Sequence, residues 1–126
     1  MSGMDLVEFL RARLDEDEAA ARNVDEHGPF TVYPGDGAYL LYDGTDPVVM
    51  VSMPSEPLAF HIARHDPARV LAEVAAKRAL VEEHGIESSE QEYCKICDTL
   101  TWPCGTLRYL AAVYADCEGY DERWRP

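Results

Sequence analysis

The sequence predicts an α+β fold with three main helices, a small antiparallel β-meander and a zinc ion that staples the chain. Three observations lead to this prediction. Apolar residues recur at helical spacing in three segments, β-prone runs alternate with turn residues over 30–53, and a histidine precedes three closely spaced cysteines. Because 126 residues is the length of one ordinary domain, we expect a single domain over 1–126.

The first predicted element is an amphipathic helix over residues 5–22. Its apolar residues recur three or four positions apart and so share one face: Leu6, Phe9, Leu10 and Leu14. Asp5 is suited to cap the start of this helix, with Glu8 three residues later as in a capping box. The acidic residues of its second half are expected to form a solvated face.

A small antiparallel sheet is predicted over residues 30–53. Its β-prone segments are 30–33, 38–42 and 48–53. Glycine and proline separate these segments, and Asp43-Gly-Thr-Asp46 has residues typical of a hairpin turn. Because short connections join neighbouring antiparallel strands, the three segments are expected to form a meander.

The region 55–84 is predicted to contain two helices. Ser55-Glu56-Pro57 is predicted to open the first helix. This first helix is short and is expected to end near Arg64.

The second helix of this region is the longest predicted element and extends from Pro67 to His84. Asp66 is suited to be its N-cap and Gly85 its C-cap. Arg78 interrupts the apolar stripe of the helix. We therefore expect the stem of Arg78 to lie along the apolar surface, with the head group in water.

The rest of the chain is divided into a predicted metal loop over 85–104 and a C-terminal helix and tail over 105–126. The helix is expected over about 106–115, where apolar residues recur at helical spacing: Leu107, Leu110, Ala111 and Tyr114. Tyr120 and Trp124 are expected to pin the tail to the body of the protein.

Three cysteines and one histidine form the strongest chemical signal in the sequence. The spacing of Cys94 and Cys97 lets one turn aim two sulfurs at a single metal ion. Cys104 begins the last helix and His84 ends the longest one, so antiparallel packing of these helices would bring both residues together. We therefore predict a structural Zn²⁺ bound by His84, Cys94, Cys97 and Cys104.

Other interpretations of these residues remain open. Cys117 is a rival for the fourth ligand, although thirteen helical residues would place it about 20 Å from Cys104. The cysteines can also be reduced thiols without a metal. A redox-active C-x-x-C is disfavoured because such motifs usually open a helix after a strand. His61 and His65 have chelating spacing, but an exposed pair without a metal is the expected state.

Composition and charge exclude several functional classes. The net charge of −13 disfavours direct binding to nucleic acid, because such binders carry an excess of Lys and Arg. No apolar run approaches the ~18 residues of a membrane span, and the acidic N-terminus differs from a secretory signal. We therefore expect a cytoplasmic protein. No glycine-rich phosphate loop or nucleophile elbow is present, so no catalytic residue is predicted.

Three segments of the sequence carry a family resemblance: His61-Ile-Ala-Arg-His-Asp-Pro-Ala-Arg-Val-Leu-Ala-Glu-Val74, Leu107-Arg-Tyr-Leu-Ala111 and Trp124-Arg-Pro126. With the N-terminal helix, they resemble a domain-of-unknown-function family of actinobacteria, especially streptomycetes, and their phages. The resemblance covers most of the chain and implies no known activity. Members of that family often have His at the position of Cys117, which keeps this residue open as a rival ligand.

The leading functional hypothesis is a small, acidic, zinc-stabilised protein-interaction module, such as an accessory protein of a phage or mobile element. Its partner is expected to be an unidentified protein. One alternative is a zinc enzyme, which keeps a coordination position open for water. Another is a DNA-mimicking inhibitor, which would require carboxylates on one face at phosphate-like spacing: Asp15, Glu16, Asp17 and Glu18 are the candidates.

Overall fold

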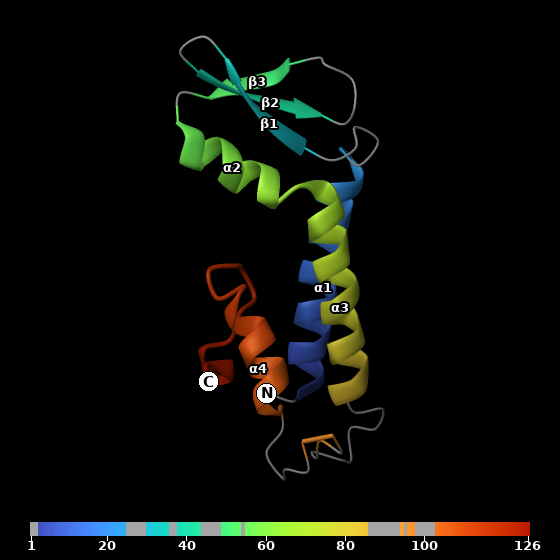
Figure 1. Ribbon diagram of the computed structural model, residues 1–126. Coiled ribbons are helices and arrows are strands. Elements are labelled where there is room, and N and C mark those ends of the chain that lie inside the picture. The colour runs from blue at the N-terminus through green and yellow to red at the C-terminus, as the bar shows by residue number, and fades with distance from the viewer. Residues whose placement is uncertain are drawn as a thin grey trace. The chain divides into compact units, whose positions relative to one another are not determined.

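The computed structural model of the protein describes residues 3–24, 30–35, 38–43, 49–53, 55–85, 94, 96–97 and 103–126. This part of the chain is mostly helical (Figure 1). The helices are α1 (Gly3–Arg22), α2 (Glu56–Arg64), α3 (Pro67–His84), α4 (Gly105–Ala112) and the 3-10 helix η2 (Glu122–Trp124), and the strands are β1 (Phe30–Gly35), β2 (Ala38–Asp43) and β3 (Val49–Met53).

The chain divides into two compact units. The first comprises Met1–Glu16 and Val74–Pro126, and the second comprises Asp17–Glu73. The divisions therefore fall inside α1 and inside α3. The single domain over 1–126 stays a prediction.

In the first unit, α1, α3 and α4 bury their apolar faces. The buried side chains come from all three helices: Leu6, Phe9, Leu10 and Leu14 from α1, Val74 and Val81 from α3, and Leu107 and Ala111 from α4. The α1 residues are those that helical spacing placed on one face.

Helix α1 begins two residues earlier than predicted, so Asp5 lies in its first turn and the N-cap prediction is wrong.

The last helix is shorter than predicted, because α4 ends at Ala112 instead of near Ala115. Beyond it, backbone amides bond to the carbonyl three residues earlier, as Tyr114 does to Ala111 and Cys117 does to Tyr114. This pattern is tighter than the four-residue α-helical bond. The side chain of Tyr114 is nevertheless buried, so the apolar spacing correctly predicts which face packs inward.

The tail is pinned by its aromatic residues, as expected. Trp124 is buried, and its ring centroid lies 5.2 Å from that of Phe9 on α1. Tyr120 makes edge contacts with both rings. Gly119, at a φ of 94°, provides the turn before these aromatic residues.

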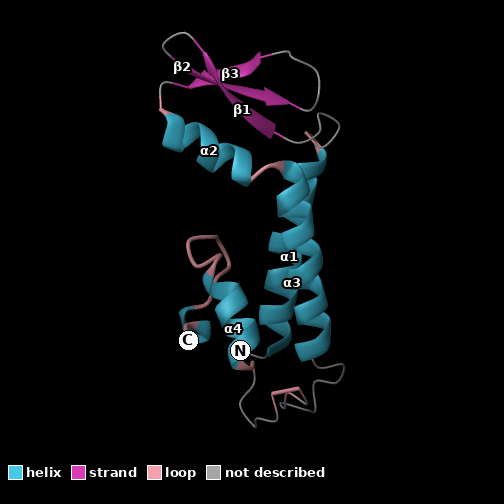
Figure 2. Cartoon of the chain, viewed as in Figure 1, coloured by secondary structure: helices cyan, strands magenta, loops and turns pink. Residues whose placement is uncertain are grey.

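The second unit contains one antiparallel sheet with the strand order β1-β2-β3 (Figure 2). Phe30 pairs with Asp43 and Gly35 with Ala38, which sets the register of β1 and β2. Between β2 and β3 the register shifts at Leu41 and Tyr42. Helix α2 contacts all three strands and buries Ala59.

Side chains cap both helix starts in the second unit, and Asp66 does so as predicted. The Ser55 hydroxyl accepts a hydrogen bond from the Leu58 amide at 3.4 Å, and α2 follows. Asp66 accepts from the Arg69 amide at 3.0 Å and thereby caps α3. Its second carboxylate oxygen accepts from the Phe30 amide of β1 at 3.4 Å.

Gly85 directly follows the last residue of α3, at the position predicted for the C-cap. The amide of Gly85 donates to the Val81 carbonyl at 2.8 Å, which continues the helical pattern. A Cβ atom at position 85 would lie 2.8 Å from that same carbonyl oxygen. Glycine is therefore required by close contact with the preceding turn.

Two other predictions concern residues outside the described ranges: the turn at 43–46 beyond Asp43, and most of the metal loop over 85–104. The Arg78 head group forms an exposed ion pair with Asp15 at 2.6 Å, which the sequence analysis did not predict. None of the helices in the described ranges combines the length and apolar character that a bilayer crossing requires.

Candidate metal centre

Three separate pieces of the chain deliver the four predicted ligands to one place. His84 is the last residue of α3, Cys104 is the N-cap of α4, and Cys94 and Cys97 lie in the connection between the two helices. The end of α3, the described part of the connection and the beginning of α4 gather at one end of the first unit (Figure 1). The predicted meeting of these helix ends is therefore confirmed.

The cluster is centred on a single imidazole nitrogen. Nδ1 of His84 lies 3.3 Å from the sulfur of Cys94, 3.4 Å from that of Cys97 and 3.6 Å from that of Cys104. All four potential ligand atoms lie within 4.8 Å of one another. The side chains of His84, Cys94 and Cys104 are buried, and that of Cys97 is half-buried.

Hydrogen bonding alone does not explain this arrangement. A neutral imidazole nitrogen either accepts one hydrogen bond or donates one, whereas three sulfurs surround Nδ1 of His84. In a tetrahedral zinc site with Zn–S near 2.3 Å and Zn–N near 2.0–2.1 Å, each N···S edge is about 3.6 Å. The observed N···S separations agree with that edge, so the donor set fits a tetrahedral cation.

Two groups around the cluster stabilise negative charge on sulfur. The Cys97 amide donates to the Cys94 sulfur at 3.4 Å, which is the local turn that C-x-x-C spacing produces. The hydroxyl of Thr106, in the first turn of α4, lies 3.7 Å from the Cys97 sulfur. A hydroxyl can donate to a thiolate, so Thr106 is positioned to orient this ligand.

The thiols have unequal acidity. Burial raises the pKa of Cys94, but hydrogen bonds from the Cys97 amide, His84 and the other two thiols outweigh burial and lower it to about 7. For Cys104, burial and the charge of neighbouring Cys94 raise the pKa to about 11, against a smaller opposing effect from the Leu107 amide. Ionising both Cys94 and Cys104 without a cation is therefore unfavourable, whereas a divalent cation would favour both thiolates.

The geometry also bears on the rival interpretations. Cys117 is not a member of the cluster, although it is among the described residues. All four cysteines are free thiols. The rings of His61 and His65 lie 4.7 Å apart and both are exposed. Within the described ranges, no third His, Cys, Asp or Glu joins them to complete a metal site.

Thr106 is the site residue that sequence reasoning missed. A threonine two residues after a ligand cysteine is too common to mark a metal centre. Its position in the first turn of a helix capped by Cys104 is the one available signal. The path of the connection before α4 decides whether Thr106 reaches Cys97.

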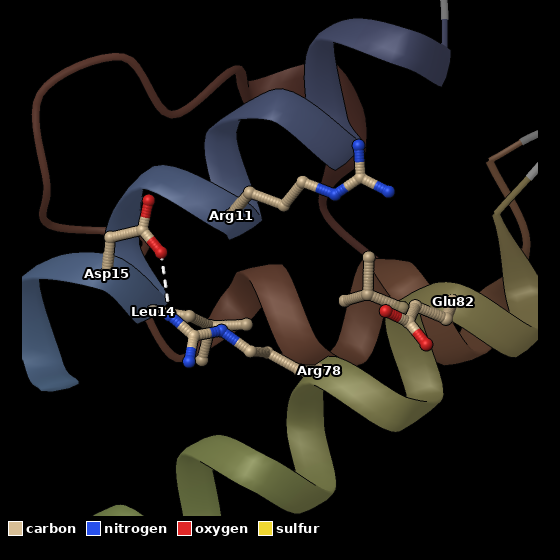
Figure 3. Close-up of a pocket in the computed structure, with 6 residues that line it drawn as sticks. Arg11, Leu14, Asp15, Arg78 and Glu82 are labelled. Carbon is tan, nitrogen blue, oxygen red and sulfur yellow. Dashed lines mark hydrogen bonds and ion pairs between the residues drawn. The ribbon is translucent and has the colours of Figure 1, made fainter.

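The first unit also contains a hollow whose lining residues are not those of the cluster. It is lined by Arg11, Leu14, Asp15, Arg78, Val81 and Glu82. Figure 3 shows the Arg78 head group directed to Asp15, with which it pairs at 2.6 Å. The residues that line the hollow include no cysteine, histidine or hydroxyl group, so the hollow adds no donor of the kind found in the cluster.

The fold and this cluster together define a small, acidic protein with a Cys3His group that can hold a metal ion. Over residues 3–126 the chain matches the model of a family of unknown function, DUF6221, and it belongs to that family. No curated protein and no solved structure matches the chain. The expected membership in a family of unknown function is thus confirmed, whereas an origin in actinobacteria or their phages stays a prediction.

Proposed function

We propose that this protein is a non-enzymatic interaction module whose first unit is held together by one structural zinc ion. The ligands are Nδ1 of His84 and the sulfurs of Cys94, Cys97 and Cys104. The observation that carries the proposal is the single imidazole nitrogen surrounded by three sulfurs at 3.3–3.6 Å. Three thiolates with one imidazole are a common donor set of structural zinc sites.

A structural role is supported by the number of protein donors. Four donors complete a tetrahedron, whereas a catalytic zinc usually has three protein ligands and one open position for water. The cluster also lies where two helix ends and their connection meet. A bound ion would therefore restrain α3, α4 and the chain between them. This restraint would stabilise the fold of a 126-residue protein, whose core is modest.

The carboxylates on which the DNA-mimic alternative depends form ion pairs with arginines, and this weakens that alternative. Asp15 pairs with Arg78 at 2.6 Å, and Glu16 pairs with Arg13 at 2.9 Å. Glu18 approaches Arg22 at 3.5 Å. Carboxylates that are already neutralised by neighbouring arginines present a weaker imitation of a phosphate backbone, so we favour binding to a protein through another surface.

We further propose a cytoplasmic location and an accessory role in a phage or mobile element. The location is supported by the four free cysteines, because a reducing compartment preserves thiols for metal binding. The accessory role is supported only by the resemblance of the sequence to a family found in actinobacteria and their phages. Neither proposal is needed for the zinc site itself.

The zinc site is tested by native mass spectrometry of protein purified without added metal, with elemental analysis to identify the ion. We expect one zinc per chain. His84→Ala, Cys94→Ser and Cys104→Ser should each reduce this occupancy strongly, and Cys117→Ser is the matched control that should retain it. Iron in place of zinc, or a metal-free protein, would contradict the proposal. Loss of the ion in Cys117→Ser would show that the ligand set is wrong.

A further inference from the structure

Two histidines of the second unit contact each other and have no part in the proposed zinc site. His61 lies in the last turn of α2, and His65 is the C-cap of that helix. Their ring centroids are 4.7 Å apart, and the ring planes are inclined by 50°. Both side chains are exposed. The pair therefore presents two imidazoles to solvent at one place on α2.

Hydrogen bonding does not occupy the nitrogens of this pair. Within the part of the chain that the structure describes, neither imidazole has a hydrogen-bond or ion-pair partner, and no hydrogen bond joins the two rings. A neutral imidazole keeps one nitrogen lone pair that can bind a metal ion. Because the terminal torsion of an exposed histidine has a broad range, each ring can direct that nitrogen to a shared ion.

The separation of the rings fits one shared ion. With metal–nitrogen distances near 2.0–2.1 Å, each ring centroid lies roughly 3.2 Å from the ion, so two such centroids at ligand angles of about 90–110° are about 4.5–5.2 Å apart. The observed 4.7 Å lies within this range. A spacing of four residues places both rings on the same helix face, as in histidine pairs that chelate zinc from one helix.

The position of the pair and its donor atoms indicate which ion fits. His61 and His65 lie at the C-terminal end of α2, where the partial negative charge of the helix dipole favours a cation. Imidazole nitrogens suit Zn²⁺, Cu²⁺ and Ni²⁺, whereas Mg²⁺ and Ca²⁺ prefer oxygen ligands. The donor set therefore selects a divalent transition-metal ion.

We propose that His61 and His65 chelate one exchangeable divalent transition-metal ion, at a second site distinct from the Cys3His cluster. The two imidazoles supply two ligands, and water completes the coordination because both side chains are exposed. The ion at this site would therefore exchange readily, whereas the proposed structural zinc has four protein donors. All four residues of the cluster belong to the first unit and the histidine pair belongs to the second, so this inference does not rest on the proposed function.

The test titrates the zinc-loaded full chain with Ni²⁺ and follows binding by calorimetry. We expect one Ni²⁺ per chain, and native mass spectrometry should show that the zinc is retained. His61→Asn and His65→Asn should each weaken Ni²⁺ binding by at least about tenfold, because the second imidazole of a chelate binds in an intramolecular step. The double variant His61→Asn/His65→Asn should resemble either single variant, since one imidazole alone contributes little.

Phe60→His/His61→Asn is the matched control, because Phe60 is also exposed. It keeps two histidines in the segment but separates them by five residues, on different faces of the helix. This variant should bind Ni²⁺ as weakly as His61→Asn does. Cys117→Ser removes the thiol outside the cluster and should bind Ni²⁺ like the parent.

The inference is overturned if the single variants bind Ni²⁺ like the parent, or if the effects of the two substitutions simply add, since the histidines would then act independently. It is also overturned if the matched control binds like the parent, if excess Mg²⁺ displaces Ni²⁺, or if Ni²⁺ replaces the zinc. A parent protein that lacks zinc but binds Ni²⁺ through His61 and His65 would defeat the proposed function and support this inference.

Discussion

The three cysteines around His84 have different neighbours, and Cys94 and Cys104 differ in acidity as a result. Cys94 receives a hydrogen bond from the Cys97 amide, and its pKa falls to about 7. Cys104 is buried beside it, and its pKa rises to about 11. Cys97 has the Thr106 hydroxyl at 3.7 Å. Among the residues that the structure describes, the Thr106 hydroxyl is the side-chain group outside the ligand set that lies within hydrogen-bonding distance of a ligand sulfur.

Thr106→Val should weaken zinc binding by about tenfold, because it removes a hydroxyl that orients and stabilises the Cys97 thiolate while preserving side-chain volume. The measurement is a competition titration with a chromogenic zinc chelator. Thr106→Ser keeps the hydroxyl and is the matched control, with affinity close to that of the parent. Equal affinities for parent and Thr106→Val would show that this contact has no role in metal binding.

At the residue scale, the four clustered residues could be predicted because metal ligands must converge and their spacing in the sequence is restrictive. Cys94 and Cys97 are close enough to share one turn, and His84 and Cys104 mark helix ends. Thr106 could not be predicted in the same way. Its contact with Cys97 depends on the three-dimensional path of the connection between α3 and α4.

At the scale of elements, capping residues and aromatic contacts explain where each segment begins and what it packs against. The bounds of α3 agree with the prediction because Asp66, Pro67 and Gly85 are strong local signals. The end of α4 was placed too late, because apolar spacing continues through Tyr114 while the backbone has already changed to tighter bonding. Apolar spacing reports the buried face and is insensitive to this change.

The C-terminal 3-10 helix should contribute substantially to stability through one side chain. Trp124 is buried against Phe9 of α1 and also contacts Tyr120. Trp124→Ala removes this packing and should lower the free energy of unfolding by about 3–5 kcal/mol, as measured by urea denaturation. Ala12→Ser, at an exposed position of α1, should change it by less than about 0.5 kcal/mol. A loss below 1 kcal/mol for Trp124→Ala would mean that the tail is not pinned in solution.

At the scale of the whole molecule, the proposed ligands all belong to one of the two compact units. His84 and the three cysteines fall in the first unit, and the second contributes none of them. Zinc is therefore expected to act directly on the first unit only. The sequence predicts where the ligands lie, but it contains no local signal for a division that falls inside two continuous helices.

Removal of zinc should lower the thermal midpoint by about 10 °C or more, because binding energy of a structural ion is folding energy. Hydrogen exchange after treatment with a strong chelator should become faster in α4 and at the end of α3. Amides of β1, β2 and β3 should change less, since no ligand comes from their unit. A single thermal transition would support one domain over 1–126. Unchanged exchange in α4 would contradict a stapling role for the ion.

The carboxylate of Asp66 serves two segments that lie far apart in the sequence. One oxygen caps α3 through the Arg69 amide, and the other receives the Phe30 amide of β1. Asparagine, which replaces an ordinary capping aspartate at little cost, has only one acceptor oxygen and would have to abandon one of these amides. The Asp66 carboxylate thus links the start of β1 to the start of α3. Fewer residues can replace it than can replace an ordinary N-cap residue.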